Sequence, residues 1–152
     1  MEKKYEFTGD TQKACGCTLR QIRALRSFGS VTAGDLGGWI EKEENLSHEG
    51  ACWVGDSAQV RGLARVRHPE DLCVFQGFGR EYRSTTAHID AVIGIRINCG
   101  CFSGSLDEFR KQVIETHGAE SRDGLLYLGM ANMIEVRLEE AASKGRDDAK
   151  RS

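Results

Sequence analysis

The sequence predicts a mixed β/α fold, in which a short left-handed β-helix-like (hexapeptide) coil packs on an α+β part with two helices. Three observations predict it. A valine returns every six residues within Ala51–His68, a helix-capping box stands at Ser105–Glu108, and a second apolar helical stripe follows at 124–142. Repeats of six residues are typical of coils, and capped apolar stripes are typical of helices that cover a sheet.

The first elements of the chain are short. Tyr5–Thr8 is predicted as a strand that a Gly-Asp pair ends. Thr18–Phe28 is ambiguous, because its apolar residues recur at helical spacing while the flanking glycines and the short length suit a strand. The segment Val31–Glu49 carries turn residues around single apolar anchors. We interpret it as an irregular first coil that leads into the regular six-residue units.

The six-residue units carry the strongest pattern of the chain. Val54, Val60 and Val66 keep the step of six, and Ala58 and Ala64 fall four residues after the first two valines. In a left-handed parallel β-helix each unit forms one side of a triangular coil, with the valine inside and a small residue near the corner. The valines close only about one coil of roughly 18 residues. The sequence therefore predicts a scaffold rather than an enzymatic channel.

Pro69 ends this pattern, because proline cannot donate a backbone hydrogen bond to a sheet. It predicts a boundary between a β-rich region at 1–68 and a region of strands and helices at 69–142. A small antiparallel meander is predicted from period-two alternation, with strands at Leu72–Phe78, Ser84–Ala91 and Ile93–Asn98.

Two helices are predicted to complete the chain. Ser105 is the expected N-cap of the first helix, Glu108 closes the capping box, and Gly118 suits the C-terminal position. The second helix is expected at about Gly124–Ala142, and residues 143–152 are expected to form a flexible charged tail. A coil this short has open ends, so we expect the C-terminal part to cover one end and a homodimer contact to cover the other.

Composition indicates a globular protein without a strong preference for one kind of partner. The 152 residues carry a formal net charge of −2. No apolar run approaches the roughly 20 residues that cross a bilayer, and the N-terminus lacks the apolar region of a signal peptide. The sequence therefore predicts a cytoplasmic protein of the host cell, with its cysteines as free thiols or metal ligands.

Two Cys-Gly-Cys elements are weak candidates for a metal site. Cys15, Cys17, Cys99 and Cys101 could supply four thiolates to a tetrahedral zinc, although the usual zinc spacing is Cys-x-x-Cys. His68 follows the last six-residue unit, where hexapeptide acyltransferases place a general base. Those enzymes need several full coils, so no catalytic residue is assigned and no cofactor is predicted.

Charged and aromatic residues of the coil are candidates for an interaction surface. An acidic run at 35–49 could dock on a basic surface, and tryptophans are frequent interface anchors. Arginines among the six-residue units could contact phosphates, but no aromatic residues are interleaved with them, so direct nucleic-acid binding is the less favoured alternative. The candidate interaction residues are Trp39, Glu41, Glu43, Glu44, Trp53, Arg61, Arg65 and Arg67.

Two segments resemble uncharacterised phage and prophage proteins. In those proteins GGWI, ENLSHEG and CWV precede hexapeptide-like repeats, and a GCF-x-G-x-LDEF module often closes the chain; this sequence contains GGWIEKEENLSHEGACWV and INCGCFSGSLDEF. The resemblance covers roughly residues 17–140. It implies a phage origin, a β-helical front and an α+β cap, and it brings no catalytic residue.

The resemblance and the lack of a catalytic pattern lead to one expected function and two alternatives. The expected function is a non-enzymatic phage accessory protein that binds a host protein complex, such as an anti-CRISPR-like inhibitor of host defence. The first alternative is a structural or assembly accessory of the phage. The second is an acyltransferase-like enzyme, which would bind an acyl-CoA.

Overall fold

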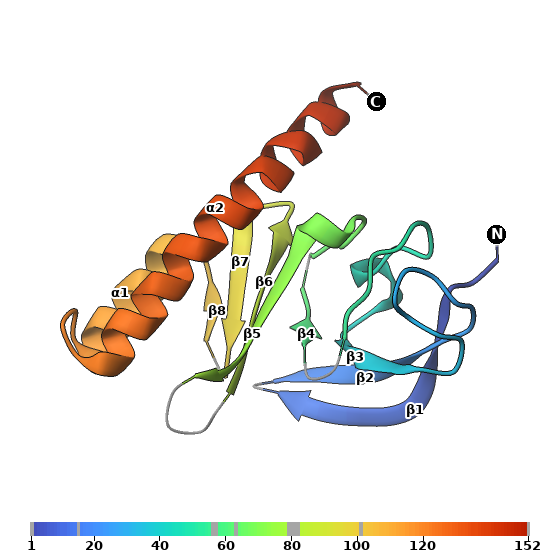
Figure 1. Cartoon of the computed structure of the whole chain (residues 1–152), viewed down its shortest axis with the longest axis horizontal. Coiled ribbons are helices and arrows are strands. Elements are labelled where there is room, and N and C mark those ends of the chain that lie inside the picture. The colour runs from blue at the N-terminus through green and yellow to red at the C-terminus, as the bar shows by residue number, and fades with distance from the viewer. Residues whose placement is uncertain are drawn as a thin grey trace.

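The computed structural model describes residues 2–14, 16–55, 58–62, 64–78, 83–100 and 102–151. Strands dominate the first two thirds of the chain, and helices follow (Figure 1). The strands are β1 (Tyr5–Ala14), β2 (Cys17–Ala24), β3 (Leu36–Ile40), β4 (Gln59–Val60), β5 (Leu72–Phe78), β6 (Arg83–Asp90), β7 (Gly94–Cys99) and β8 (Phe102–Gly104). The α-helices are α1 (Leu106–His117) and α2 (Arg122–Arg151), and two short 3-10 turns are η1 (Glu43–Asn45) and η2 (Pro69–Asp71).

The strands form two four-stranded sheets, and the predicted left-handed β-helix is wrong. One sheet has the order β1-β2-β3-β4 and the other β5-β6-β7-β8. Every strand pair is antiparallel except β3–β4. We refer to residues 2–66, which contain the first sheet, as the N-terminal unit, and to residues 69–151 as the C-terminal unit.

The valine ladder is nevertheless buried. Val54, Val60 and Val66 are at most 1% exposed. Over the described residues the chain pairs in parallel at a single rung, in which Ile40 meets Val60 and Leu46 meets Val66, each pair 20 residues apart in the sequence. The six-residue spacing indicates only that these side chains face inward. One parallel pairing of the chain is enough to bury them. Antiparallel strands then occupy the position that further coils would take.

The ambiguous segment at 18–28 contributes a strand, not a helix. Strand β2 forms a hairpin with β1, and Leu19 and Ile22 are fully buried. The strand predicted at Tyr5–Thr8 continues to Ala14, with a shift in register between Phe7 and Thr11. The chain passes through this bulge because Gly9 adopts a φ of +100°, a value that residues with a Cβ rarely adopt.

Close backbone contact explains the paired glycines of β3. A Cβ on Gly38 would lie 2.7 Å from the carbonyl oxygen of Ala58, and one on Gly37 would lie 2.6 Å from the Trp53 ring. Glycine therefore lets β3 approach the loop that precedes β4. That approach is stabilised by a hydrogen bond from Gly38 N to Val54 O at 2.7 Å.

The C-terminal unit follows its sequence pattern closely. Ser105 Oγ accepts a hydrogen bond from Glu108 N at 3.2 Å, and Glu108 Oε1 accepts one from Ser105 N at 3.1 Å, which confirms the predicted capping box. Gly118 ends α1 with a φ of +84°. The three predicted strands correspond to β5, β6 and β7 within one residue at either end, and β8 adds a strand that was not predicted.

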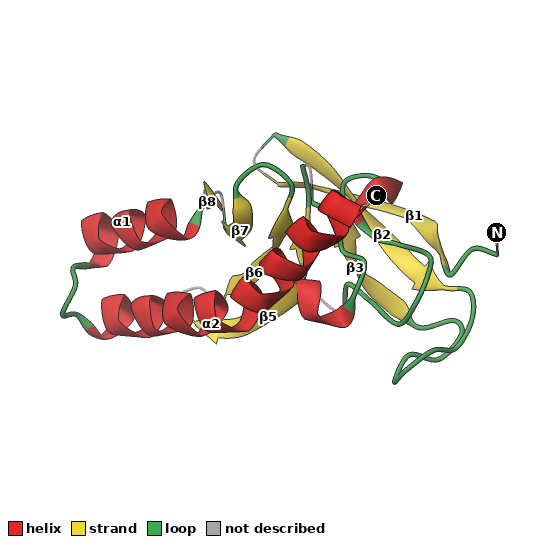
Figure 2. Ribbon diagram, turned by 90° about the horizontal axis from the view of Figure 1, so that it is seen from above, coloured by secondary structure: helices red, strands yellow, loops and turns green. Residues whose placement is uncertain are grey.

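Helix α2 carries the predicted stripe and extends beyond it. Tyr127, Met130, Ile134 and Leu138 are at most 7% exposed and pack on one face of the second sheet together with α1. The helix continues to Arg151, past the end predicted at Ala142, so the charged residues of the expected tail are helical. Figure 2 shows α1 and α2 side by side, projecting beyond the sheet. Neither helix, over the described residues, has the length and apolar character needed to cross a membrane.

The two units meet through a set of polar groups and through Leu72, which packs against the core of the N-terminal unit. Gln59 N donates to Thr86 Oγ1 at 3.2 Å, and Asn98 Nδ2 donates to Gln59 O at 3.4 Å. Asn98 also accepts from Arg61 Nε at 3.3 Å and lies 3.0 Å from His88 Nε2. We call these five residues the polar seam. The C-terminal unit thus lies against the β4 side of the parallel pairing.

The opposite end of the rung is covered by β2, which pairs with β3. The open end on which the homodimer prediction depended is therefore occupied by the protein's own hairpin. Self-association remains a prediction, but an open end of the coil no longer supports it.

Candidate functional site

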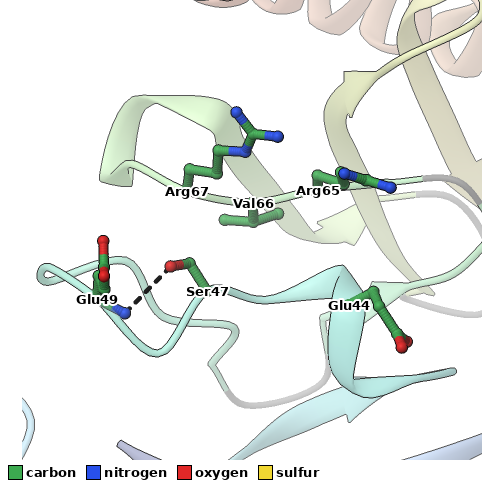
Figure 3. A pocket seen from close by; sticks show the side chains of 6 residues that line it. All are labelled: Glu44, Ser47, Glu49, Arg65, Val66 and Arg67. Carbon is green, nitrogen blue, oxygen red and sulfur yellow. Dashed lines mark hydrogen bonds between the residues drawn. The ribbon is translucent and has the colours of Figure 1, made fainter. Parts of the chain in front are cut away.

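A cavity of about 450 Å³ opens beside the parallel rung, and both of its walls carry charge (Figure 3). We call it the charged groove. Its lining residues are Glu44, Ser47, Glu49, Arg65, Val66 and Arg67.

The parallel rung positions the two arginines of the charged groove. Val66 N donates to Asn45 O at 2.9 Å, and Ser47 N donates to Val66 O at 2.9 Å. Val66 is buried at 1% exposure, and alternation along an extended chain then turns Arg65 and Arg67 outward, where both are exposed. The six-residue pattern that buries the valine therefore also presents the arginines.

Turns on either side of the rung fix the remaining wall. Asn45 is fully buried, and its Nδ2 donates to Gly62 O at 3.1 Å and to Ala64 O at 2.9 Å. Glu49 N donates to Ser47 Oγ at 3.0 Å, as Figure 3 shows. On the other strand, Arg67 N donates to Asp71 Oδ2 at 3.0 Å. The backbone of the groove is thus held on both sides, while its charged side chains face solvent.

Three of the predicted interaction residues are brought together in this groove: Glu44, Arg65 and Arg67. Glu43 lies next to it on η1 and is engaged by its neighbours. Its Oε1 is 2.8 Å from His48 Nε2 and 3.4 Å from Lys3 Nζ. The hydrogen bond with His48 lowers the pKa of the Glu43 carboxyl.

The other predicted interaction residues serve the fold. Glu41 Oε1 accepts from Gly62 N at 2.7 Å and closes a turn. Arg61 is only 5% exposed and belongs to the polar seam. Trp39 is half-buried on β3. Trp53 is half-buried, and its ring meets Phe28 edge-on at 5.4 Å between centroids.

Trp53 also lines a second cavity, of about 490 Å³, between the loop at 51–55 and strand β5. Its other lining residues are Ala51, Gly55, Pro69, Leu72, Cys73, Val74 and Gln76. This cavity is lined by segments that follow the two walls of the charged groove in the sequence, and the two cavities share no lining residue.

One cysteine of each Cys-Gly-Cys element lies at the end of a strand, beside a hairpin connection. Cys17 pairs with Ala14 where β1 turns into β2, and Cys99 pairs with Phe102 where β7 turns into β8. The central glycines, 16 and 100, have φ values of +89° and +59°. Cys15 and Cys101 lie outside the described residues. Within the described ranges, no group of three or more His, Cys, Asp or Glu side chains is placed to hold a metal ion.

The histidines have separate structural surroundings. His68 is exposed, and its backbone N donates to Asp71 Oδ2 at 3.0 Å. His88 is fully buried in the polar seam, where burial lowers its pKa to about 4. His48 accepts from Lys4 N at Nδ1, and His117 stacks on Tyr127. The structure therefore does not group them into a site.

Buried polar residues are what the sequence reasoning missed. Lys4, Asn45, His88 and Asn98 are each at most 2% exposed. Each of them has at least one partner 10 to 48 residues away in the sequence, and no local pattern could have revealed those contacts. Only the position of Asn45 within a turn-rich segment gave a signal, since asparagine side chains often bond to nearby backbone.

Comparison with known proteins gives one partial likeness. No protein-family model matches the chain. A segment of 42 residues is 53% identical to part of the uncharacterized acetyltransferase YdcK of Escherichia coli (strain K12). That segment is 28% of this chain, and the chain matches only 13% of the length of the relative. The chain is therefore similar to a short piece of that protein, and the likeness does not assign it to a family.

Proposed function

We propose that the chain is a non-enzymatic binding protein that recognises a protein partner through the charged groove. The observation that supports this is that Glu44, Arg65 and Arg67 line one exposed cavity, although Glu44 precedes the two arginines by 21 and 23 residues in the sequence. Charged side chains on a rigid backbone give specificity and fast association.

The mixed charge of the groove favours a polypeptide over a nucleic acid. Arg65 and Arg67 are two residues apart on an extended strand, or about 7 Å, and each can form paired hydrogen bonds with a carboxylate. Glu44 and Glu49 line the same cavity and would repel a phosphate backbone. A protein segment with both acidic and basic side chains would form ion pairs with the two arginines and with the two glutamates.

The biological setting of the proposal depends on the resemblance to phage proteins. On that basis we propose that the protein acts in the cytoplasm of an infected bacterium, with a host complex, such as a CRISPR component, as the partner. Its alternative, an assembly accessory of the phage, has a phage protein as the partner. The same surface serves either partner, so one experiment addresses both.

Affinity capture with matched variants tests the proposal. The double variant Arg65→Glu/Arg67→Glu reverses the charge of one wall, and Lys111→Glu on the exposed surface of α1 is the control. We expect the wild type and the control to retain one stoichiometric protein from an infected-cell lysate, and the double variant to lose it. Equal retention by all three proteins would overturn the role of the groove, and the identity of the retained protein separates host from phage partners.

The likeness to an acetyltransferase favours a second candidate, an acyl-CoA-binding activity. Binding of acetyl-CoA stabilises a folded protein in proportion to the logarithm of its concentration. This candidate predicts a rise in Tm with increasing acetyl-CoA that Arg65→Glu/Arg67→Glu does not abolish. An unchanged Tm at saturating acetyl-CoA removes it.

A further inference from the structure

A lysine ammonium group is enclosed within the N-terminal unit. Lys4 precedes β1 and is fully buried. Its Nζ lies 2.6 Å from Cys52 O and 3.4 Å from the carbonyl oxygens of Glu49 and Gly50. The Phe28 ring lies 5.0 Å from Nζ on a further side. A lysine surrounded in this way is held in one position.

The backbone beside Lys4 is also fixed. Lys4 N donates to His48 Nδ1 at 3.0 Å, and the ring of Tyr5 stacks on His48 at 4.1 Å between centroids. Tyr5 OH donates to Leu46 O at 2.7 Å. The start of β1 is thus attached to the segment at 46–52 through several independent contacts, so the lysine and that segment move together.

The fifth neighbour of the Lys4 amine is a thiol. Cys52 Sγ lies 3.3 Å from Nζ, and Cys52 is fully buried. Burial lowers the pKa of Lys4 and so favours its neutral, nucleophilic form. The described residues include three other free cysteines, Cys17, Cys73 and Cys99. None of them is hydrogen-bonded to a lysine amine within the described part of the chain.

We propose that Lys4 and Cys52 form an oxidation site at which dioxygen joins Nζ to Sγ through a single oxygen atom. The amine loses one hydrogen, the thiol loses one hydrogen, and one oxygen atom of O₂ forms bonds to both nitrogen and sulfur. The second oxygen atom leaves with the two hydrogens as water. Nitrogen and sulfur each give up two electrons, which are the four that O₂ accepts.

Burial favours this product over the usual fates of an oxidised cysteine. A disulfide with glutathione needs a bulky thiol to reach Sγ, which a fully buried side chain prevents, whereas dioxygen is small and uncharged. The Lys4 amine, 3.3 Å from Sγ, is placed to form the second bond to an oxygen atom that sulfur has taken up. The link would join residues 4 and 52 and enclose β1, β2 and β3, independently of any partner at the charged groove.

Intact-mass measurement of the full-length protein tests the proposal. After incubation in air-saturated buffer, we expect a denatured mass increased by about 14 Da, for one oxygen gained and two hydrogens lost, and its return to the original value with a thiol reductant. Peptide mapping should join the peptide that contains Lys4 to the one that contains Cys52. The linked form should have a Tm higher by on the order of 10 °C, as for a loop of this length closed by a disulfide.

Variants assign the link to its two atoms. Cys52→Ser and Lys4→Arg should each abolish the mass increase, whereas the control Cys73→Ser should retain it. An unchanged wild-type mass, or an increase of about 16 or 32 Da confined to a cysteine peptide, would overturn the proposal. Because the decisive comparison is made on the wild type with and without reductant, it holds even where a variant fails to fold.

Discussion

The two units of this protein are stabilised in different ways. The C-terminal unit is a regular sheet covered by amphipathic helices, with a core of aliphatic and aromatic residues from α1, α2 and the strands. In the N-terminal unit, most of the chain between β2 and β5 is turns and loops. Buried polar groups such as Lys4 and Asn45, with their backbone partners, hold those loops in place.

This difference shows two ways in which a sequence can determine the backbone conformation. Helices and β-sheets pair their own backbone N–H and C=O groups, so side-chain packing only has to bury their apolar faces. Loops leave carbonyl and amide groups to be paired, and a buried side chain that supplies the partners determines the loop. We expect core truncation to damage the C-terminal unit most, and loss of a polar side chain to damage the N-terminal unit most.

The largest effect is expected from Ile134→Ala. Ile134 is fully buried between α2 and the second sheet, so its truncation should lower the free energy of unfolding by about 4 kcal/mol. Urea unfolding followed by circular dichroism measures this change. Val136→Ala is the control on the same helix, since Val136 is 78% exposed. Equal losses for the two variants would contradict the assigned face of α2.

The next effect concerns pH and the polar seam between the units. Burial lowers the pKa of His88 to about 4. The unfolded chain binds a proton at a pKa of about 6.5. Between these values only the unfolded chain gains the proton, so stability is lost as the pH falls from about 6.5 to about 4, by about 3 kcal/mol in total.

Urea unfolding at pH 7.5 and pH 4.5 checks this expectation, with His88→Gln as the control that removes the titration. The charged groups facing His88 are Asp90, Arg96 and Arg61. They remain in the control, so the difference between the two proteins isolates the histidine. The same pH dependence in both would show that His88 does not limit stability in acid.

Asn45→Ala should have a smaller effect, confined to the N-terminal unit. The change removes two donated bonds and the bond that Asn45 Oδ1 accepts from Lys42 N at 2.9 Å, and it leaves the carbonyl of buried Ala64 without its Asn45 donor. We expect a loss of about 2 kcal/mol. Hydrogen exchange should then show faster exchange at 40–66 with α2 unaffected. Uniformly faster exchange throughout the chain would erase the distinction between the units.

Ser105→Ala should have the smallest effect. It removes the N-cap of α1 and should cost about 1 kcal/mol in urea unfolding. Ser105→Asp preserves an acceptor for the Glu108 amide and should restore most of that loss. If the aspartate is no better than the alanine, the capping bond does not contribute to stability.

Sequence reasoning predicted the C-terminal unit well, because its signals are local. The Ser105–Glu108 capping box, the stripe of α2 and the alternation of β5 to β7 lie within the elements they define. In the N-terminal unit the six-residue step correctly indicated inward valines. It could not predict the number of parallel pairings, because a buried valine gives the same sequence pattern in one pairing or in many.

The sequence predicted which types of residue form the candidate site, but it did not predict which of the candidate residues lie together. Glu44, Arg65 and Arg67 share the charged groove because the parallel rung places residues 20 apart side by side. Arg61, four residues before Arg65, enters the polar seam instead. The spacing of these arginines in the sequence does not distinguish the buried Arg61 from the exposed Arg65. The Lys4–Cys52 contact was beyond prediction, because its partners are 48 residues apart and neither belongs to a recognisable motif.

The polar seam has a consequence for how the molecule comes apart. Water can replace hydrogen bonds such as those of Gln59, Arg61 and Asn98 one at a time, whereas separating two apolar surfaces exposes them together. Separating the two units would therefore break the polar seam bond by bond, but it would also expose Leu72, which packs against the core of the N-terminal unit. The seam sets the alignment of the two units, and the apolar contact at Leu72 opposes their separation.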